Sequence, residues 1–288
     1  MHKIPFDDSL TVEHIKWFVN HGKKLLTADG KEVEVWEFQH KNDEKILSAW
    51  AKHFRNHYCL DTDIDFLRGK LSRQDYLTKI KFPCKTTSLG PGIRAGDFGE
   101  ILVCDYLQYV LDYWIPRVRW NSKVIRDESP KGSDVIGFRF QSEDGISDND
   151  VLIVFESKTK FSSSGSNRLQ DAINDSAKDH LRIDESLNFI KQKLHEKRKD
   201  KQAKFVERFQ NPVDLRYKEI FGAAVVYSDK FFDAKSISLA NCNKISVSAK
   251  SNKIISHPKK DNLMLIIIKG KNMMPLVHEL FRRAADEA

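Results

Sequence analysis

Long hydrophobic runs and closely spaced cysteines are missing from this sequence of 288 residues. No apolar stretch reaches the length of about 18 residues that a membrane-spanning helix needs. The opening residues, MHKIPFDDSL, lack the apolar segment and cleavage site of a signal peptide. The four cysteines lie far apart and form no Cys-x-x-Cys pair, which argues against a structural zinc site and a disulfide framework. We therefore expect a soluble cytoplasmic protein with reduced thiols.

An excess of basic side chains is present, and it is unevenly distributed. Residues 1–80 contain 13 basic and 13 acidic side chains, so the net charge of +7 arises in residues 81–288. Residues 187–208 carry eight basic and three acidic side chains, and residues 242–260 carry five lysines and no acid. Such patches favour a polyanionic partner, because binding phosphates releases condensed counterions. A solvated helix face or a soluble loop explains the same charges without a partner.

The first 90 residues offer no recognisable chemistry. Residues 10–19 and 44–58 have apolar positions at helical spacing, and residues 27–38 between them predict a turn and a short strand. The Pro- and Gly-rich residues 81–96 are the best candidate boundary. We predict a mainly helical accessory region over residues 1–90 and a second domain over residues 91–288.

The second region alternates helical and strand-like segments, which predicts an α/β fold with a mixed central sheet flanked by helices. Its expected helices are residues 94–114, 168–210 and 274–288. Its expected strands are residues 116–124, 133–140, 151–158, 219–228 and 262–270. The polar residues 141–150 suit a hairpin loop between two of these strands.

The segment VLIVFESKTK, residues 151–160, ends a wholly apolar run with charged side chains. Because side chains alternate along a strand, Glu156 and Lys158 project to the same face, roughly 6–7 Å apart. The expected hairpin brings Asp134, at the head of the preceding strand, beside Glu156. Two carboxylates and a lysine at one sheet edge need a metal or a compensating charge, since buried charges are costly.

Two alternatives stay open on the residues alone. A structural ion pair between Lys158 and either carboxylate explains the charged strand end as well as a functional site does. Glu100, in the first turns of the upstream helix, is favoured there by the helix dipole without any function. It falls, however, on the apolar stripe of that helix, where a solvated acid is not expected.

Asp134, followed 22 residues later by Glu156-Ser157-Lys158 and preceded by a helix with Glu100, resembles the active site of the PD-(D/E)XK nuclease superfamily. Pro130 stands four residues before Asp134 rather than next to it. The resemblance implies a restriction-endonuclease-like core.

The same resemblance assigns roles to these residues. Asp134 and Glu156 bind Mg²⁺, with Mn²⁺ as the alternative, and the backbone carbonyl of Ser157 is a further ligand. Lys158 positions or activates the attacking water, and Glu100 supports a metal. The helix that follows supplies an additional polar residue, for which Gln170 and Lys178 are the candidates.

The motifs GIRAGDFGE, KGSDVIGF and VFESK, followed by a long helical region, resemble more specifically the HamA family, the nuclease subunits of Hachiman anti-phage systems. This implies a DNA nuclease of little sequence specificity that a superfamily 2 helicase subunit, HamB-like, controls. A restriction or repair nuclease and a non-catalytic nucleic-acid-binding or scaffolding subunit remain alternatives. Basic residues would hold the DNA backbone; they are Lys191, Lys193, Lys197, Arg198, Lys250 and Lys253.

Overall fold

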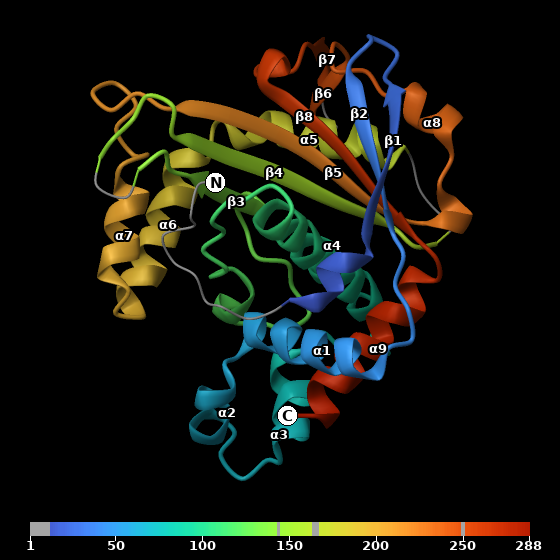
Figure 1. Cartoon of the computed structure of the whole chain (residues 1–288), viewed down its shortest axis with the longest axis vertical. Coiled ribbons are helices and arrows are strands. Elements are labelled where there is room, and N and C mark those ends of the chain that lie inside the picture. Colours follow the sequence, from blue (N-terminus) through green and yellow to red (C-terminus); the bar gives the residue numbers. More distant parts are fainter. Residues whose placement is uncertain (1–11, 143–144, 163–166, 249–250) are drawn as a thin grey trace.

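A six-stranded mixed sheet forms the centre of the computed structural model, which describes residues 12–142, 145–162, 167–248 and 251–288. The strands lie in the order β1-β2-β8-β5-β4-β3 (Figure 1). Their bounds are β1 Phe18–Leu26, β2 Glu32–Phe38, β3 Val135–Arg139, β4 Val151–Lys160, β5 Lys218–Ser228 and β8 Leu263–Gly270. The chain is thus a mixed α/β protein, as its alternating segments predict.

Parallel pairing fills the middle of the sheet and antiparallel hairpins close both edges. The neighbours β2, β8, β5 and β4 are mutually parallel, whereas β1 with β2 and β3 with β4 are antiparallel. The central strands are buried on both faces, which accounts for uninterrupted apolar runs such as residues 151–155. The expected hairpin between β3 and β4 is confirmed, with Val135 opposite Phe155.

One face of the sheet is covered by α4 (Gly90–Tyr109), while α1 (Glu44–Tyr58) and α9 (Met273–Asp286) pack beyond the ends of the strands and share the same core (Figure 1). Side chains of β4 at alternate positions, Ile153 and Phe155, belong to this core. The short helices α2 (Asp61–Leu67) and α3 (Arg73–Tyr76) follow α1. Two 3-10 turns, Glu13–Trp17 and Trp120–Ser122, and a π-helical turn, Leu77–Lys81, complete this side.

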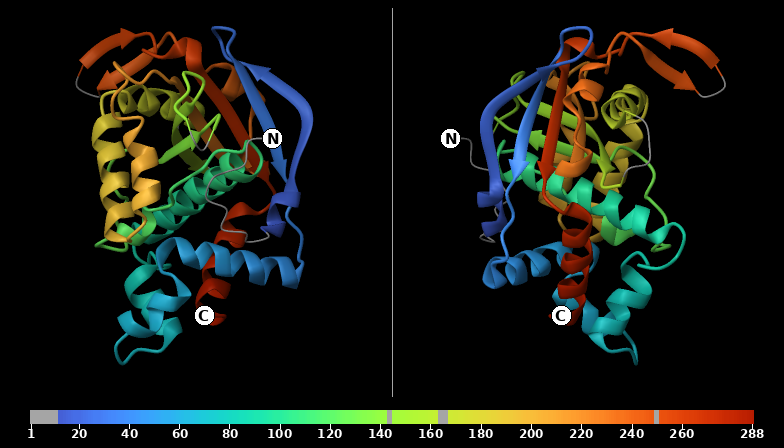
Figure 2. Two further views of the ribbon diagram at one scale, coloured as in Figure 1. Left: turned by 60° about the vertical axis from the view of Figure 1, so that its left-hand side comes forward. Right: turned by 90° about the vertical axis from the view of Figure 1, so that its right-hand side faces the viewer.

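The opposite face is covered by α5 (Arg168–Asp179), α6 (Ile183–Glu196) and α7 (Asp200–Glu207). The intervening β4 side chains Leu152 and Val154 belong to this second core, so the protein has three layers. The strands β6 (Ile245–Ser248) and β7 (Ser251–Ile255) form a separate hairpin that projects from the body (Figure 2). Further short elements are α8 (Ala234–Ser238) and the 3-10 turns Asp229–Phe231 and Lys260–Asn262.

Several local predictions differ from the structure. Residues 10–19 were expected to form a helix, but the described part is a 3-10 turn followed by β1, whose residues 20–24 are exposed. The expected strand at residues 116–124 is a loop containing a 3-10 turn. The expected helix at 168–210 is three helices, and β6 and β7 were not predicted. Within the described residues, no helix is long and apolar enough to cross a membrane.

The N-terminal region contributes directly to the central sheet. β2 pairs with β8 over six residues, from Val33 opposite Leu265 to Phe38 opposite Gly270. α1 also packs against α9 at the other end of the chain. Residues on both sides of position 90 therefore share one sheet and one core, while the division of the chain at residue 90 stays a prediction.

Candidate functional site

The charged end of β4 lies where its neighbour β3 is missing. The ladder with β3 ends at Val135 opposite Phe155, whereas pairing with β5 continues to Lys160 opposite Tyr227. The next backbone N–H on the open side, that of Ser157, donates to Asp134 Oδ2 at 3.0 Å. The Asp134 carboxylate thus takes the place of a strand carbonyl, which fixes it beside the β4 tip.

Glu156 and Lys158 leave β4 on the same face, as side-chain alternation predicts. Lys158 Nζ lies 2.5 Å from Glu156 Oε1 and 2.8 Å from Oδ2 of Asp175 on α5. Glu156 is only 8% exposed. Burial and the nearby Asp134 carboxylate raise the pKa of Glu156 to about 9, against the opposing effect of Lys158. Without a further cation, the Glu156 carboxyl is therefore held in its neutral, protonated form at pH 7.

Glu100 reaches the same site through an arginine. Arg119 Nε donates to Glu100 Oε2 at 3.0 Å, and its Nη2 donates to Asp134 Oδ1 at 2.8 Å. α4 can approach β4 closely at this level because residue 99 is glycine: a Cβ there would lie 2.3 Å from Thr159 Cγ2. Burial, followed by repulsion from Asp134, raises the pKa of Glu100 to about 8 despite the attraction of Arg119.

Two aspartates of α5 also belong to this site, and the sequence analysis missed them. Asp175 accepts from Lys158, while Asp179 Oδ1 accepts from Ser133 Oγ at 2.9 Å. Asp179 is 2% exposed, and within the described residues its Oδ2 has no hydrogen-bond partner. Burial raises its pKa to about 7, with a further contribution from Asp134. Their spacing of four, which places two side chains on one helix face, was the available signal.

We refer to Glu100, Asp134, Glu156, Asp175 and Asp179, with Arg119 and Lys158, as the acid cluster. Of the two candidates proposed on the following helix, Lys178 pairs with Asp175 at 2.6 Å and so touches the edge of this cluster. Gln170 is directed elsewhere: its amide bonds the backbone of Asn241 and Lys244.

The basic residues proposed for DNA binding lie in two places. Lys191 and Lys193 on α6 pair with Glu207 and Glu196, whereas Lys197 and Arg198 are exposed at the end of that helix. Lys250 lies outside the described residues. Lys253 belongs to β7, and its side chain is not among those described.

A second polar cluster lies between α1 and α4, in a region where the sequence indicated no chemistry. His53 Nε2 is 3.0 Å from Asp105 Oδ1, and His14 Nε2 is 2.9 Å from Asp105 Oδ2. The ligand atoms of His53, His57 and Asp105 lie within 4.8 Å of one another, close enough to hold one metal ion. Neither His53 nor His57 was among the predicted site residues, although a spacing of four on a helix brings both to one face.

In this histidine cluster an arginine occupies the position that a cation would take. Arg117 donates to His57 Nε2 at 2.8 Å and to Asp105 Oδ1 at 2.7 Å. Burial favours the neutral acid, but Arg117 and His53 outweigh it and hold the pKa of Asp105 well below its usual range. Burial and Arg117 lower the pKa of His57, so its imidazole stays neutral. The cluster is electrically balanced by its own side chains.

Comparison with known proteins supports one assignment. A search of curated proteins found no match. The sequence model of the HamA family matches residues 13–284, nearly the whole chain, including both clusters. This protein therefore belongs to the HamA family, a component of Hachiman defence systems.

Proposed function

We propose that this protein is a metal-dependent DNA nuclease of the PD-(D/E)XK type that hydrolyses phosphodiester bonds with little sequence specificity. The observation that carries the proposal is the arrangement at the end of β4. Asp134 is held on the Ser157 N–H, and Glu156 and Lys158 emerge beside it on one face. The presence of both carboxylates and the lysine favours a catalyst over a non-catalytic scaffold.

The side chains of the acid cluster fit a hard divalent cation such as Mg²⁺ or Mn²⁺. Carboxylate oxygens are the preferred protein ligands of these ions. Glu100, Asp134, Glu156 and Asp179 are buried or half-buried, while Arg119 and Lys158 are the cations in contact with them. One oxygen of Asp179 has no partner within the described residues. The site therefore has oxygen donor atoms for an added cation, which would displace the protons that the raised pKa values of Glu100 and Glu156 keep there.

Each residue then has a defined task. Asp134 and Glu156 would hold the metal, and the Ser157 carbonyl faces the same open edge as its N–H group and would be a further ligand. When bound, the cation supplies a Lewis acid for the phosphoryl oxygen and a lowered pKa for water. Lys158, kept charged by Glu156 and Asp175, stabilises negative charge on the phosphate. Arg119 fixes Glu100 relative to Asp134.

Membership of the HamA family supports a proposal about control by a partner. We propose that a superfamily 2 helicase subunit, HamB-like, binds this protein and restrains cleavage until DNA is engaged. A nuclease that reads little sequence would otherwise damage its own genome. The exposed Lys197 and Arg198 at the end of α6 suit contacts with the DNA backbone.

Plasmid cleavage tests the site. We expect the full chain, with Mg²⁺ and with or without the co-encoded helicase, to cleave plasmid DNA. Glu156→Gln and Lys158→Met should each slow cleavage by about a hundredfold or more, because each removes charge from the reacting centre. The matched controls are Glu219→Gln on β5 and Lys160→Met on β4, which should retain the wild-type rate.

Two results would overturn this proposal. One is unchanged cleavage in both acid-cluster variants while circular dichroism shows them folded. The other is absence of cleavage by the wild type in the presence of its helicase and DNA.

A further inference from the structure

A cavity of about 220 Å³ opens beside the acid cluster. Its walls are formed by residues 115–120 after α4, residues 131–136 leading into β3, the first half of α6, and Cys104 of α4. Asp134 and Arg119 belong both to this lining and to the acid cluster. The cavity therefore borders the proposed metal site through these two residues.

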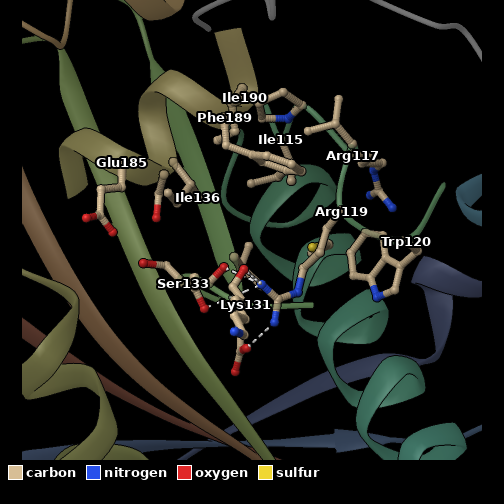
Figure 3. Close-up of a pocket in the computed structure, with 17 residues that line it drawn as sticks. Ile115, Arg117, Arg119, Trp120, Lys131, Ser133, Ile136, Glu185, Phe189 and Ile190 are labelled. Atoms are coloured by element: carbon tan, nitrogen blue, oxygen red, sulfur yellow. Dashed lines mark hydrogen bonds and ion pairs between the residues drawn. The ribbon is translucent and has the colours of Figure 1, made fainter. Parts of the chain in front are cut away.

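The two ends of the cavity differ in character (Figure 3). Ile115, Phe189 and Ile190 gather at one end. Arg119, Lys131 and Ser133 lie at the other, where Arg119 also bonds the carbonyl groups of residues 130 and 133 at 2.9 Å. A ligand that matches this space has a flat apolar part and, at its other end, an anionic group directed at the acid cluster.

An exposed aromatic ring marks the apolar end. Phe189 of α6 is 37% exposed, whereas its neighbours Leu187 and Ile190 on the same helix are buried in the core. Lys193 Nζ lies 5.9 Å from the centre of the Phe189 ring. A partly exposed ring that lines the cavity beside a cation offers a stacking surface for a nucleobase.

We propose that this cavity receives one unpaired nucleobase of the DNA strand, stacked on Phe189, while the attached phosphate lies at the acid cluster. The proposal rests on the nuclease function and adds how the substrate is held. The volume suits a single ring system rather than a larger ligand. Because every base has an aromatic face, stacking holds the strand without selecting a sequence. The bound nucleotide must be unpaired, since a base inside a duplex cannot enter the cavity.

A comparison of abasic strands tests this inference independently of cleavage. Fluorescence anisotropy measures binding of the full chain to single-stranded 12-mers in Ca²⁺, with gel analysis to verify that the strands stay intact. Because binding without sequence selection leaves the register free, each oligonucleotide retains a single base in an otherwise abasic strand, and its comparison strand replaces this base too by an abasic analogue. We expect that replacement to lower the affinity about tenfold, the scale of one stacked base.

Two variants locate the effect. Phe189→Ala should weaken binding of the strand with the retained base about tenfold and abolish the penalty for removing that base. The matched control is Phe66→Ala on α2, which removes an aromatic ring that is 89% exposed and should leave the penalty unchanged. Both side chains are exposed, so neither variant should compromise folding.

The results separate this inference from the nuclease proposal. Equal binding of the strands with and without the retained base, no binding at all, or a full penalty in Phe189→Ala would overturn the base-binding cavity, even if plasmid is cleaved. A penalty for removing the retained base that disappears in Phe189→Ala would support the cavity, even if the protein and its helicase leave plasmid intact.

Discussion

The acid cluster and the histidine cluster are both buried, both border α4 and both contain an arginine, yet their electrostatics are opposite. In the histidine cluster Arg117 meets one carboxylate, and the pKa of Asp105 is lowered. In the acid cluster Arg119 and Lys158 face several carboxylates, and the pKa values of Glu100 and Glu156 are raised. We infer from this difference that the histidine cluster is a structural network whose charges its own side chains balance, and we propose that the acid cluster is the one that takes up an added cation.

The largest expected effect on stability is that of a substitution in the histidine cluster. Asp105→Asn leaves the buried Arg117 without its carboxylate, and we expect the free energy of unfolding to fall by about 3–5 kcal/mol. Glu156→Gln removes one of several repelling acids, so without metal it should be neutral or stabilising. Urea denaturation of the two variants measures the contrast. Equal losses in both would remove the distinction between the clusters.

Metal addition should act on the acid cluster alone. At about 100 times its dissociation constant, Mg²⁺ or Mn²⁺ should raise the free energy of unfolding of the wild type by about 2.7 kcal/mol. Asp134→Asn should lose this increment, while His57→Gln should keep it. Thermal denaturation with metal and with EDTA provides the measurement. A metal effect that is lost in His57→Gln and kept in Asp134→Asn would instead assign the ion to the histidine cluster.

The smallest expected effect is in the pH dependence without metal. Because the pKa of Glu156 is about 9 in the folded protein and ordinary when unfolded, the folded state holds more protons between pH 4.5 and 9. The free energy of unfolding should therefore fall as pH rises through this window.

Glu156→Gln should reduce that fall by about 1–2 kcal/mol in total, since Glu100 and Asp179 share the titration. Melting temperatures of both proteins from pH 5 to pH 9 in EDTA measure the difference. If the melting temperatures of the wild type and the variant changed in parallel with pH, the pKa of Glu156 would not be raised, and neighbouring cations would already balance its charge.

Local pattern was sufficient to predict the centre of the fold and part of the site. The apolar runs predicted β4, β5 and β8, and alternation placed Glu156 and Lys158 on one face, as observed. The hairpin loop predicted that Asp134 would lie at the β4 tip, where it accepts from Ser157. These features depend on the alternation of side chains along a strand and on the pairing of strands that follow each other directly in the sequence.

The remaining features depend on contacts between distant segments. Asp105 meets His14 and His53 across separations of 91 and 52 residues, which no local pattern encodes. Arg119 was part of the expected strand at residues 116–124. It links Glu100 to Asp134 because this segment is instead a loop that places its side chain between them. β1 escaped prediction because its exposed polar residues lack the alternation of a half-buried strand.

The two arginines that serve the two clusters stand two positions apart and contact acids five positions apart on α4. Five helical residues rise about 7.5 Å, and two residues of extended chain span at most about 7 Å. The ion pairs of Arg117 with Asp105 and of Arg119 with Glu100 therefore hold the loop that follows α4 against this helix in one register. Inserting or deleting one residue between these arginines would prevent the two pairs from forming together. We expect family members to conserve the chain length from 117 to 119.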